Sequence, residues 1–106
     1  MIVRIWHGFT TPENADKYEK LLYEEVWKSI EGKNIKGYRG IELLKREQTE
    51  EVEFITIMKF DGINDVKEFV GEDYTKAYVP PKAQLLLKRF DSHSQHYEHL
   101  AAVNYQ

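Results

Sequence analysis

Residues 51–78, EVEFITIMKFDGINDVKEFVGEDYTKAY, decide the fold of this chain. The first part, residues 52–60, is rich in residues that favour β-structure and predicts a strand. Because side chains alternate along a strand, one of its faces carries Val52, Phe54, Thr56, Met58 and Phe60. Asp61 and Gly62 then predict a turn.

An amphipathic helix is predicted directly after this turn. Asn64 or Asp65 suits its N-cap, and Gly71 suits its end. Its apolar side chains recur at helical spacing, and the spacing continues past Gly71: Ile63, Val66, Phe69, Val70, Tyr74, Ala77 and Tyr78. Pro80 and Pro81 break the pattern.

A similar strand and helix open the chain. Residues 2–9 predict a strand that is apolar on both faces, with Arg4 and Trp6 on the face opposite to His7. Thr10 or Thr11 suits the cap of a helix that ends at Gly32. The helix carries an apolar stripe of Ala15, Tyr18, Leu22, Val26 and Ile30.

The remaining segments complete a ferredoxin-like order. Residues 32–40 predict a glycine-rich loop at the rim of a site, and residues 41–47 pair with the 52–60 strand as a hairpin. Residues 83–87 predict a helical turn or two, and residues 95–101 predict a fourth strand on topological grounds. The order β-α-β-β-α-β predicts an α+β fold with an antiparallel four-stranded sheet, as a single domain over residues 1–106.

A homodimer follows from this arrangement. Two helices cover only one face of a four-stranded sheet, whereas the strands predicted at 2–9 and 52–60 are apolar on both faces. The other sheet face must therefore be buried, and a second copy of the chain is the simplest partner.

The composition restricts the classes of function. The net charge is −3 and the basic residues are not clustered, which argues against nucleic acid as a partner. The chain has no cysteine, which excludes disulfides and thiolate metal sites and is consistent with a reducing cytoplasm. No apolar run has the length of a membrane span, and the first residues lack the pattern of a signal peptide.

Several stretches together resemble one known family. They are residues 52–60, Val66–Phe69, Tyr78–Ala83, Arg89–Asp91, His96–Glu98, the helix start at Pro12–Ala15 and the loop exit at Gly37–Gly40. In these stretches the chain resembles the antibiotic biosynthesis monooxygenase domain family. The resemblance implies a dimeric α+β barrel with a pocket between sheet and helices in each subunit. Members include cofactor-independent oxidases of phenols and quinols, haem-degrading oxygenases, and proteins of no known activity.

The haem-degrading members have a characteristic set of residues. The resemblance implies an Asn on the first strand, a Trp on the second helix and an axial His a few residues later. This chain has Trp6, Phe69 and Tyr78 at those positions, and none of them matches. Tyrosine can ligate haem iron, but the set that cleaves the ring is absent. We therefore expect no cofactor and rank haem degradation last.

Aromatic residues mark the candidate site. Trp6, Phe69 and Tyr74 form a wall suited to a flat aromatic ligand, with Tyr38 and Arg39 at the rim. For an enzyme, His7 is the candidate base if it faces the pocket, and Tyr78 is the candidate donor to a developing oxyanion.

Two interpretations of these residues remain open. One is a cofactor-independent monooxygenase acting on a small phenol or quinol. The other is a non-catalytic ligand-binding protein, in which the aromatic side chains simply fill the core. Polar groups converging on one cavity would favour the first, and a cavity filled by Trp6 and Phe69 would favour the second.

The histidines near the C-terminus form the only histidine cluster of the chain, and on a helix their spacing would suit a metal site. His93, His96 and His99 are three residues apart. On a strand, His96 faces away from the other two, which then lie about 20 Å apart. We therefore expect no metal site.

Overall fold

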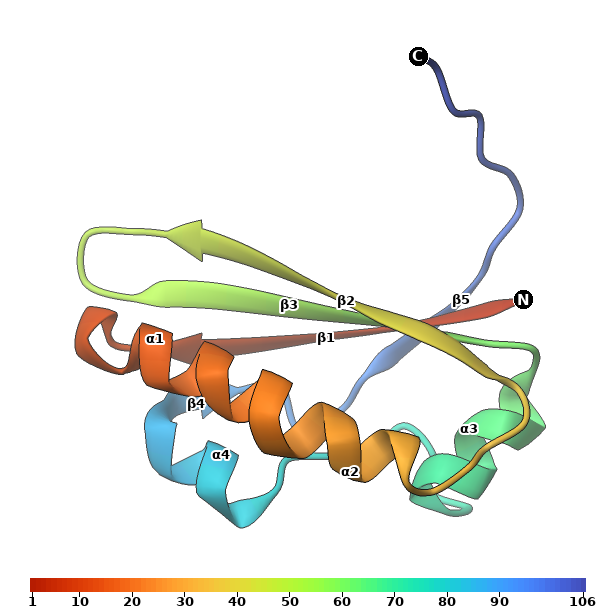
Figure 1. Ribbon diagram of the computed structural model, residues 1–106, viewed down its shortest axis with the longest axis horizontal. Helices are drawn as coiled ribbons and strands as arrows, with labels where there is room; N and C mark the ends of the chain where they lie inside the picture. The colour runs from red at the N-terminus through yellow and green to blue at the C-terminus, as the bar shows by residue number, and fades with distance from the viewer.

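The computed structural model covers residues 1–106 and contains ten helical or strand elements (Figure 1). Their order is β1 (Ile2–Thr10), α1 (Pro12–Leu21), the π-helix η1 (Leu22–Val26), α2 (Trp27–Glu31), β2 (Tyr38–Glu47), β3 (Val52–Phe60), α3 (Ile63–Val70), α4 (Pro81–Leu86), β4 (Leu87–Phe90) and β5 (Gln95–Glu98). The predicted α+β class with an antiparallel sheet is confirmed.

The sheet has the strand order β2-β3-β1-β4, and β5 also pairs with β1. The fourth strand predicted over 95–101 forms only in part, as β5, and β4 was not predicted as a strand. β4 pairs with the end of β1, and β5 pairs with its start. Between them the chain leaves β1, because the backbone NH of Ala77 donates to Ser92 and the NH of Ser94 donates to Thr75. The register of β5 ends at Glu98, three residues earlier than expected.

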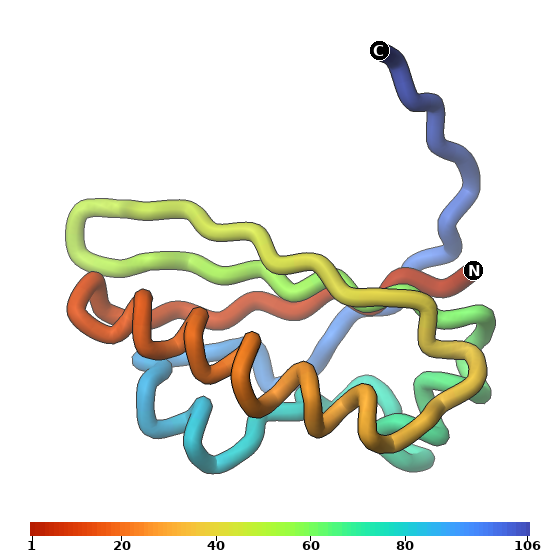
Figure 2. The backbone as a smooth tube through the Cα atoms, viewed as in Figure 1, coloured from red at the N-terminus to blue at the C-terminus, as the bar shows by residue number.

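Helices cover one face of the sheet (Figure 1). α1, η1 and α2 form one continuous helical path that crosses this face, as the backbone trace in Figure 2 shows. The expected stripe on this path is buried: Ala15, Tyr18, Leu22, Val26 and Ile30. It packs on the buried face of β3, where Phe54 and Phe60 have no exposed surface. This layer is the hydrophobic core.

The first helical path ends at Gly32 as predicted, and Asn34 takes the positive φ of 54°. Two other local predictions were wrong in detail. The N-cap of α3 is Gly62, and Asp65 instead accepts a hydrogen bond from the Gly62 NH at 3.1 Å. β2 begins at Tyr38, because the strand pairing extends to Phe60 of β3 and shortens the predicted loop.

The segment after α3 is not helical, although helical spacing continues there. Gly71 adopts a φ of 97°, which ends the helix, and no helix resumes before Pro81. Its backbone pairs with the segment after β4, including an antiparallel bridge between Lys76 and His93. Tertiary pairing has overridden the local pattern here.

The other face of the sheet carries no helix (Figure 1). Its apolar side chains are only partly buried or exposed: Val3, Ile5, Phe9, Leu44, Ile55 and Ile57. The last residues extend away from the body of the protein with Leu100, Val103 and Tyr105 exposed (Figure 2). None of the helices combines the length and the apolar character that a membrane span requires.

Candidate functional site

A pocket lies between the sheet and the helices, where the resemblance implied one. Trp6 of β1 and Met58 of β3 line its sheet side, and Val26 and Trp27 line its helix side. Twelve of its sixteen lining residues are hydrophobic. The pocket therefore provides a largely apolar environment with few polar groups, as small-molecule sites usually do.

Trp6 is held firmly against the sheet. Its Nε1–H donates to the carbonyl of Asp91 at 2.8 Å. A Cβ at Gly8 would lie 2.7 Å from the Trp6 ring, so the ring occupies space that only a glycine at position 8 leaves free. Both tryptophans of the chain, Trp6 and Trp27, line the pocket. Their fluorescence should therefore report on its contents.

Phe69 and Tyr78 form the aromatic wall at the α3 end. Their ring centroids are 4.9 Å apart and tilted by 50°. Phe69 is 4% exposed and also packs 6.0 Å from the ring of Phe60. Phe69 therefore belongs both to the core and to the pocket wall, whereas Tyr78 is only partly buried.

Arg4 is the charged group in the pocket, and it is 3% exposed. Its Nη1 donates to the Tyr74 carbonyl at 2.5 Å and lies 3.0 Å from His96 Nε2, and its Nη2 donates to the Lys76 carbonyl at 2.9 Å. All these acceptors are neutral groups when His96 is unprotonated. Burial lowers the pKa of Arg4 to about 10, so the guanidinium remains charged at neutral pH.

His96 supports Arg4 rather than lining the pocket. Burial, together with the positive charge of Arg4, lowers the pKa of His96 to about 4. The neutral imidazole can then accept a hydrogen bond from the guanidinium. The ring of Tyr74 stands edge-on to His96 with centroids 5.2 Å apart. Tyr74 thus contributes its carbonyl to Arg4 and its ring to His96, behind the pocket lining.

The two predicted rim residues lie away from the cavity. Tyr38 packs on Phe60 with ring centroids 5.5 Å apart, and burial raises the pKa of its phenol to about 12. Arg39 is paired with Asp61 through Nε and Nη2, at 2.8 and 2.6 Å. Of the predicted ligand-binding residues, the pocket lining includes Trp6 and Phe69, together with Tyr78.

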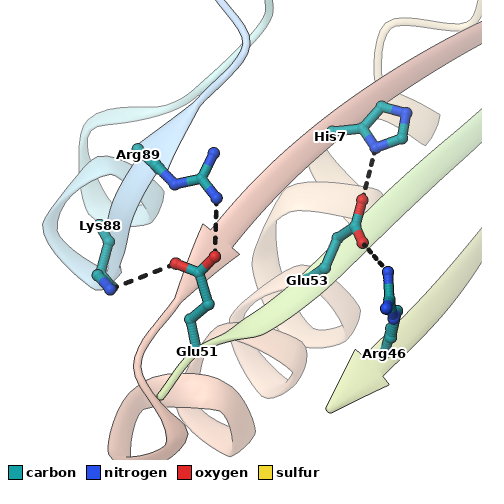
Figure 3. Close-up of polar contacts among 6 residues, drawn as sticks. All are labelled: His7, Arg46, Glu51, Glu53, Lys88 and Arg89. Atoms are coloured by element: carbon teal, nitrogen blue, oxygen red, sulfur yellow. Dashed lines mark hydrogen bonds and ion pairs between the residues drawn. The ribbon is translucent and has the colours of Figure 1, made fainter. Parts of the chain in front are cut away.

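His7 lies on the uncovered face of the sheet, opposite to the pocket. Figure 3 shows its Nδ1 directed at Glu53, with a distance of 2.8 Å to Oε2. Arg46 approaches the other oxygen of Glu53 at 4.0 Å. The condition attached to His7 as a base, that it face the pocket, is therefore not met. Nearby, Glu51 joins Lys88 and Arg89 in a second charged group (Figure 3).

The structure adds polar residues that sequence reasoning missed. Arg4, Thr56 and Ser94 line the pocket, as does the buried Tyr18, whose phenol pKa is raised by burial. The signal for Arg4 was available, since it shares a strand face with Trp6 in an otherwise apolar strand. Ser94 offered no signal, because only the pairing of its segment with Thr75 brings it to the pocket.

The cavity left by these side chains is small, about 50 Å³. A water molecule needs about 10–15 Å³ by this kind of measure, and a dry cavity of about 150 Å³ takes benzene. A groove of about 420 Å³ lies outside it, between η1–α2 and the residues around Pro81. Val26, Tyr78 and Pro80 line both spaces, so the groove continues the cavity outward.

The three C-terminal histidines have separate surroundings. His93 contacts the Ser92 hydroxyl at 3.0 Å, His96 contacts Arg4, and His99 is exposed. No three His, Cys, Asp or Glu side chains gather closely enough to hold a metal ion.

These features define a ferredoxin-like α+β protein with a pocket between its sheet and its helix layer. No protein-family model and no curated protein matches the sequence. A solved structure of a MhuD mutant, with two manganese protoporphyrin IX molecules bound per active site, is similar with a TM-score of 0.63. The sequence identity is 15%, over 99% of this chain and 100% of that chain. This likeness supports the ferredoxin-like α+β fold, which is the fold that the resemblance to the antibiotic biosynthesis monooxygenase domain family implied.

Proposed function

We propose that this protein binds a small, flat aromatic molecule between its sheet and its helices and oxidises a phenol or quinol with dioxygen. The observation that carries the proposal is the apolar pocket that Trp6, Phe69 and Tyr78 line together with a few polar residues. Aromatic walls stack on aromatic ligands, and each such pair contributes about 0.5–1.5 kcal/mol beyond burial.

The proposed chemistry needs no cofactor. A quinol first loses one proton on ionisation and then gives two electrons to dioxygen and loses its second proton; both protons end on the reduced dioxygen, and the products are a quinone and hydrogen peroxide. For an activated methylene such as that of anthrone, one oxygen atom becomes the carbonyl and the other leaves as water. The protein supplies a pocket with little water and donors that stabilise the developing oxyanion. Tyr78 is the proposed donor.

A non-catalytic binding protein is the alternative, and one observation favours it. No histidine and no carboxylate lines the cavity. A substrate bound there would have to lose its proton without a conventional base, or through a tyrosine. A binding role requires no such group.

Oxygen uptake and tryptophan fluorescence test the proposal together. Anthrone and hydroquinone are titrated into the protein while both signals are followed. The expected result is quenching and oxygen uptake, with Tyr78→Phe reducing turnover about 10-fold or more through the loss of one hydrogen bond to a charged oxygen. Tyr23→Phe, at an exposed helical position, is the matched control. Quenching without oxygen uptake would support the binding role alone. The absence of both quenching and oxygen uptake would refute the proposed ligand class.

We also propose that the protein is a homodimer joined through the uncovered sheet face. Ile5, Ile55 and Ile57 lie on this face without a covering helix. A sheet face of this kind is usually buried against another layer. A second copy would bury it and give the exposed C-terminal residues Leu100 and Val103 a surface to pack on.

A further inference from the structure

We propose that Arg4 is the binding residue for a carboxylate group, so that the natural ligand of the pocket is an aromatic carboxylic acid bound as its anion. The inference rests on the proposed aromatic site but not on the oxidation step. It assigns to the pocket a charged subsite and a substrate class that its apolar walls alone do not specify.

Arg4 differs from every other arginine in the chain. Arg39, Arg46 and Arg89 each lie within 4.0 Å of a carboxylate, and all three side chains are more than half exposed. Arg4 is buried and no carboxylate contacts it. A buried charge without a counter-ion is costly, because it has lost its water without gaining an ionic partner. A ligand anion would supply that partner.

The guanidinium of Arg4 has N–H donors that no protein group accepts from. Its protein contacts involve both protons of Nη1 and one proton of Nη2, which leaves Nε–H and the second Nη2 proton without a protein acceptor. Arg39 shows what this pair of atoms does elsewhere in the chain, because its Nε and Nη2 hold the two oxygens of Asp61. A planar fork of two donors matches a carboxylate better than a single hydroxyl.

The surroundings of Arg4 favour an anion. Two backbone carbonyls and His96 hold the guanidinium, and the low pKa of His96 keeps that ring uncharged at neutral pH. The net charge of the chain is −3, so a general attraction of anions is not expected. Any preference for an anion must therefore arise locally, at Arg4 or at an exposed lysine near the pocket wall.

The shape of the site indicates how such a ligand would lie. The cavity of about 50 Å³ has room for a carboxylate but not for a complete ring system. The ring would then extend past Tyr78 and Pro80, which line both the cavity and the outer groove. This orientation places the charge at the sheet and the aromatic body between the helices and Pro81.

Benzoate and benzamide are the probes, because they have the same size and differ in charge. Both are titrated at pH 7 with tryptophan fluorescence as the signal, since Trp6 and Trp27 line the pocket. We expect the wild-type protein to bind benzoate at least tenfold more tightly than benzamide, as a charge-assisted pair of hydrogen bonds allows. This comparison needs no variant and so does not depend on how a substitution affects folding.

Variants then locate the preference. Arg4→Met should bind both probes equally, and Arg4→Lys should retain part of the preference without the planar fork. Arg39→Met removes an arginine outside the pocket, and Lys33→Met removes the cation 5.7 Å from the ring centroid of Tyr78. Both controls should keep the preference. Circular dichroism checks that each variant is folded.

The outcomes separate this inference from the proposed function. Equal binding of the two probes by the wild-type protein would overturn the carboxylate subsite and leave the aromatic pocket standing. A preference abolished by Lys33→Met but not by Arg4→Met would also overturn it. A further outcome is that the protein prefers benzoate through Arg4 and yet consumes no oxygen with any quinol. This result would support the carboxylate subsite and refute the proposed oxidation. If the protein binds neither benzoate nor benzamide, both the carboxylate subsite and the proposed aromatic site are overturned.

Discussion

At the scale of single residues, neighbouring positions on β1 have unrelated roles. Arg4 and Trp6 face the pocket, whereas His7 faces the uncovered side of the sheet and pairs with Glu53. The alternation of side chains along a strand causes this division, so a shift of register by one residue would exchange the two sets. Of the two cationic or titratable side chains, Arg4, which contacts His96, lines the pocket and His7 does not.

The support of Arg4 by His96 predicts a dependence of stability on pH. The pKa of His96 is about 4 in the folded protein, below its ordinary value of 6.5. Between these values the unfolded chain binds a proton that the folded protein does not, so the free energy of unfolding falls as the pH is lowered from about 6.5 to 4. Urea unfolding between pH 7 and pH 5 should show this loss.

His96→Gln is the variant that tests this prediction, since its amide oxygen can still accept from Arg4. The variant should lose less stability than the wild-type protein over the same pH range. The exposed His93, replaced by Gln, is the matched control and should behave like the wild type. Parallel pH profiles for the wild type and His96→Gln would contradict the prediction.

At the scale of elements, the segment between α3 and α4 determines the shape of the pocket. Gly71 ends α3, and the following residues pair with the segment after β4 instead of continuing the helix. This path brings Tyr78 and Pro80 to the cavity and the carbonyls of Tyr74 and Lys76 to Arg4. A longer α3 could not supply these carbonyls, because helical carbonyls are used within the helix.

Gly71→Ala should therefore destabilise the protein through the backbone alone. No atom lies within 4 Å of the position that a Cβ would occupy, but the φ of 97° is strained for any residue with a side chain. The expected loss is about 1–3 kcal/mol in the free energy of unfolding, measured by urea denaturation.

Gly32→Ala is the matched control for this prediction. Gly32 has a φ of −63° and a Cβ there would make ordinary contacts, the nearest at 3.4 Å. Alanine should stabilise this position by about 0.4–1 kcal/mol, because it restricts the unfolded chain. Equal effects at both glycines would show that Gly71 does not need its left-handed conformation.

At the scale of the whole molecule, one layer of helices leaves half of the sheet surface without a covering layer. The helix-facing side forms the core and the pocket, and the other side has partly exposed apolar residues in its centre. The proposed dimer would convert this side into a second core. The pocket would remain accessible, because it opens on the helix side.

Ile57→Lys should separate the proposed dimer into monomers. Ile57 lies on the uncovered face and is partly exposed. Its cross-strand partner Glu42, which already pairs with Lys59 at 2.8 Å, can also attract a lysine at position 57, so the fold should be kept. Sedimentation equilibrium at micromolar concentration should give twice the chain mass of 12.6 kDa for the wild type and the single mass for the variant. Leu85→Lys, at an 83% exposed helical position, should remain dimeric. A wild-type mass of one chain would exclude the dimer.

The sequence by itself determined the elements as far as α3 and the faces that they bury. Periodicity identified the buried stripe from Ala15 to Ile30 and the buried face of β3, because burial of apolar area dominates folding and leaves a regular pattern. It also placed Trp6, Phe69 and Tyr78 near one crevice, since these positions follow from the order of strands and helices.

Only the tertiary structure decided the contents of the pocket. Helical spacing persists at Tyr74, Ala77 and Tyr78, but the backbone there pairs with residues 92–94, which no local pattern encodes. That pairing brings the carbonyls of Tyr74 and Lys76 to Arg4 and brings Ser94 to the cavity. It also separates β4 from β5. Contacts between segments distant in sequence depend on the packing of the whole chain, and so the neutral partners of Arg4 and the position of Ser94 became apparent only in the folded protein.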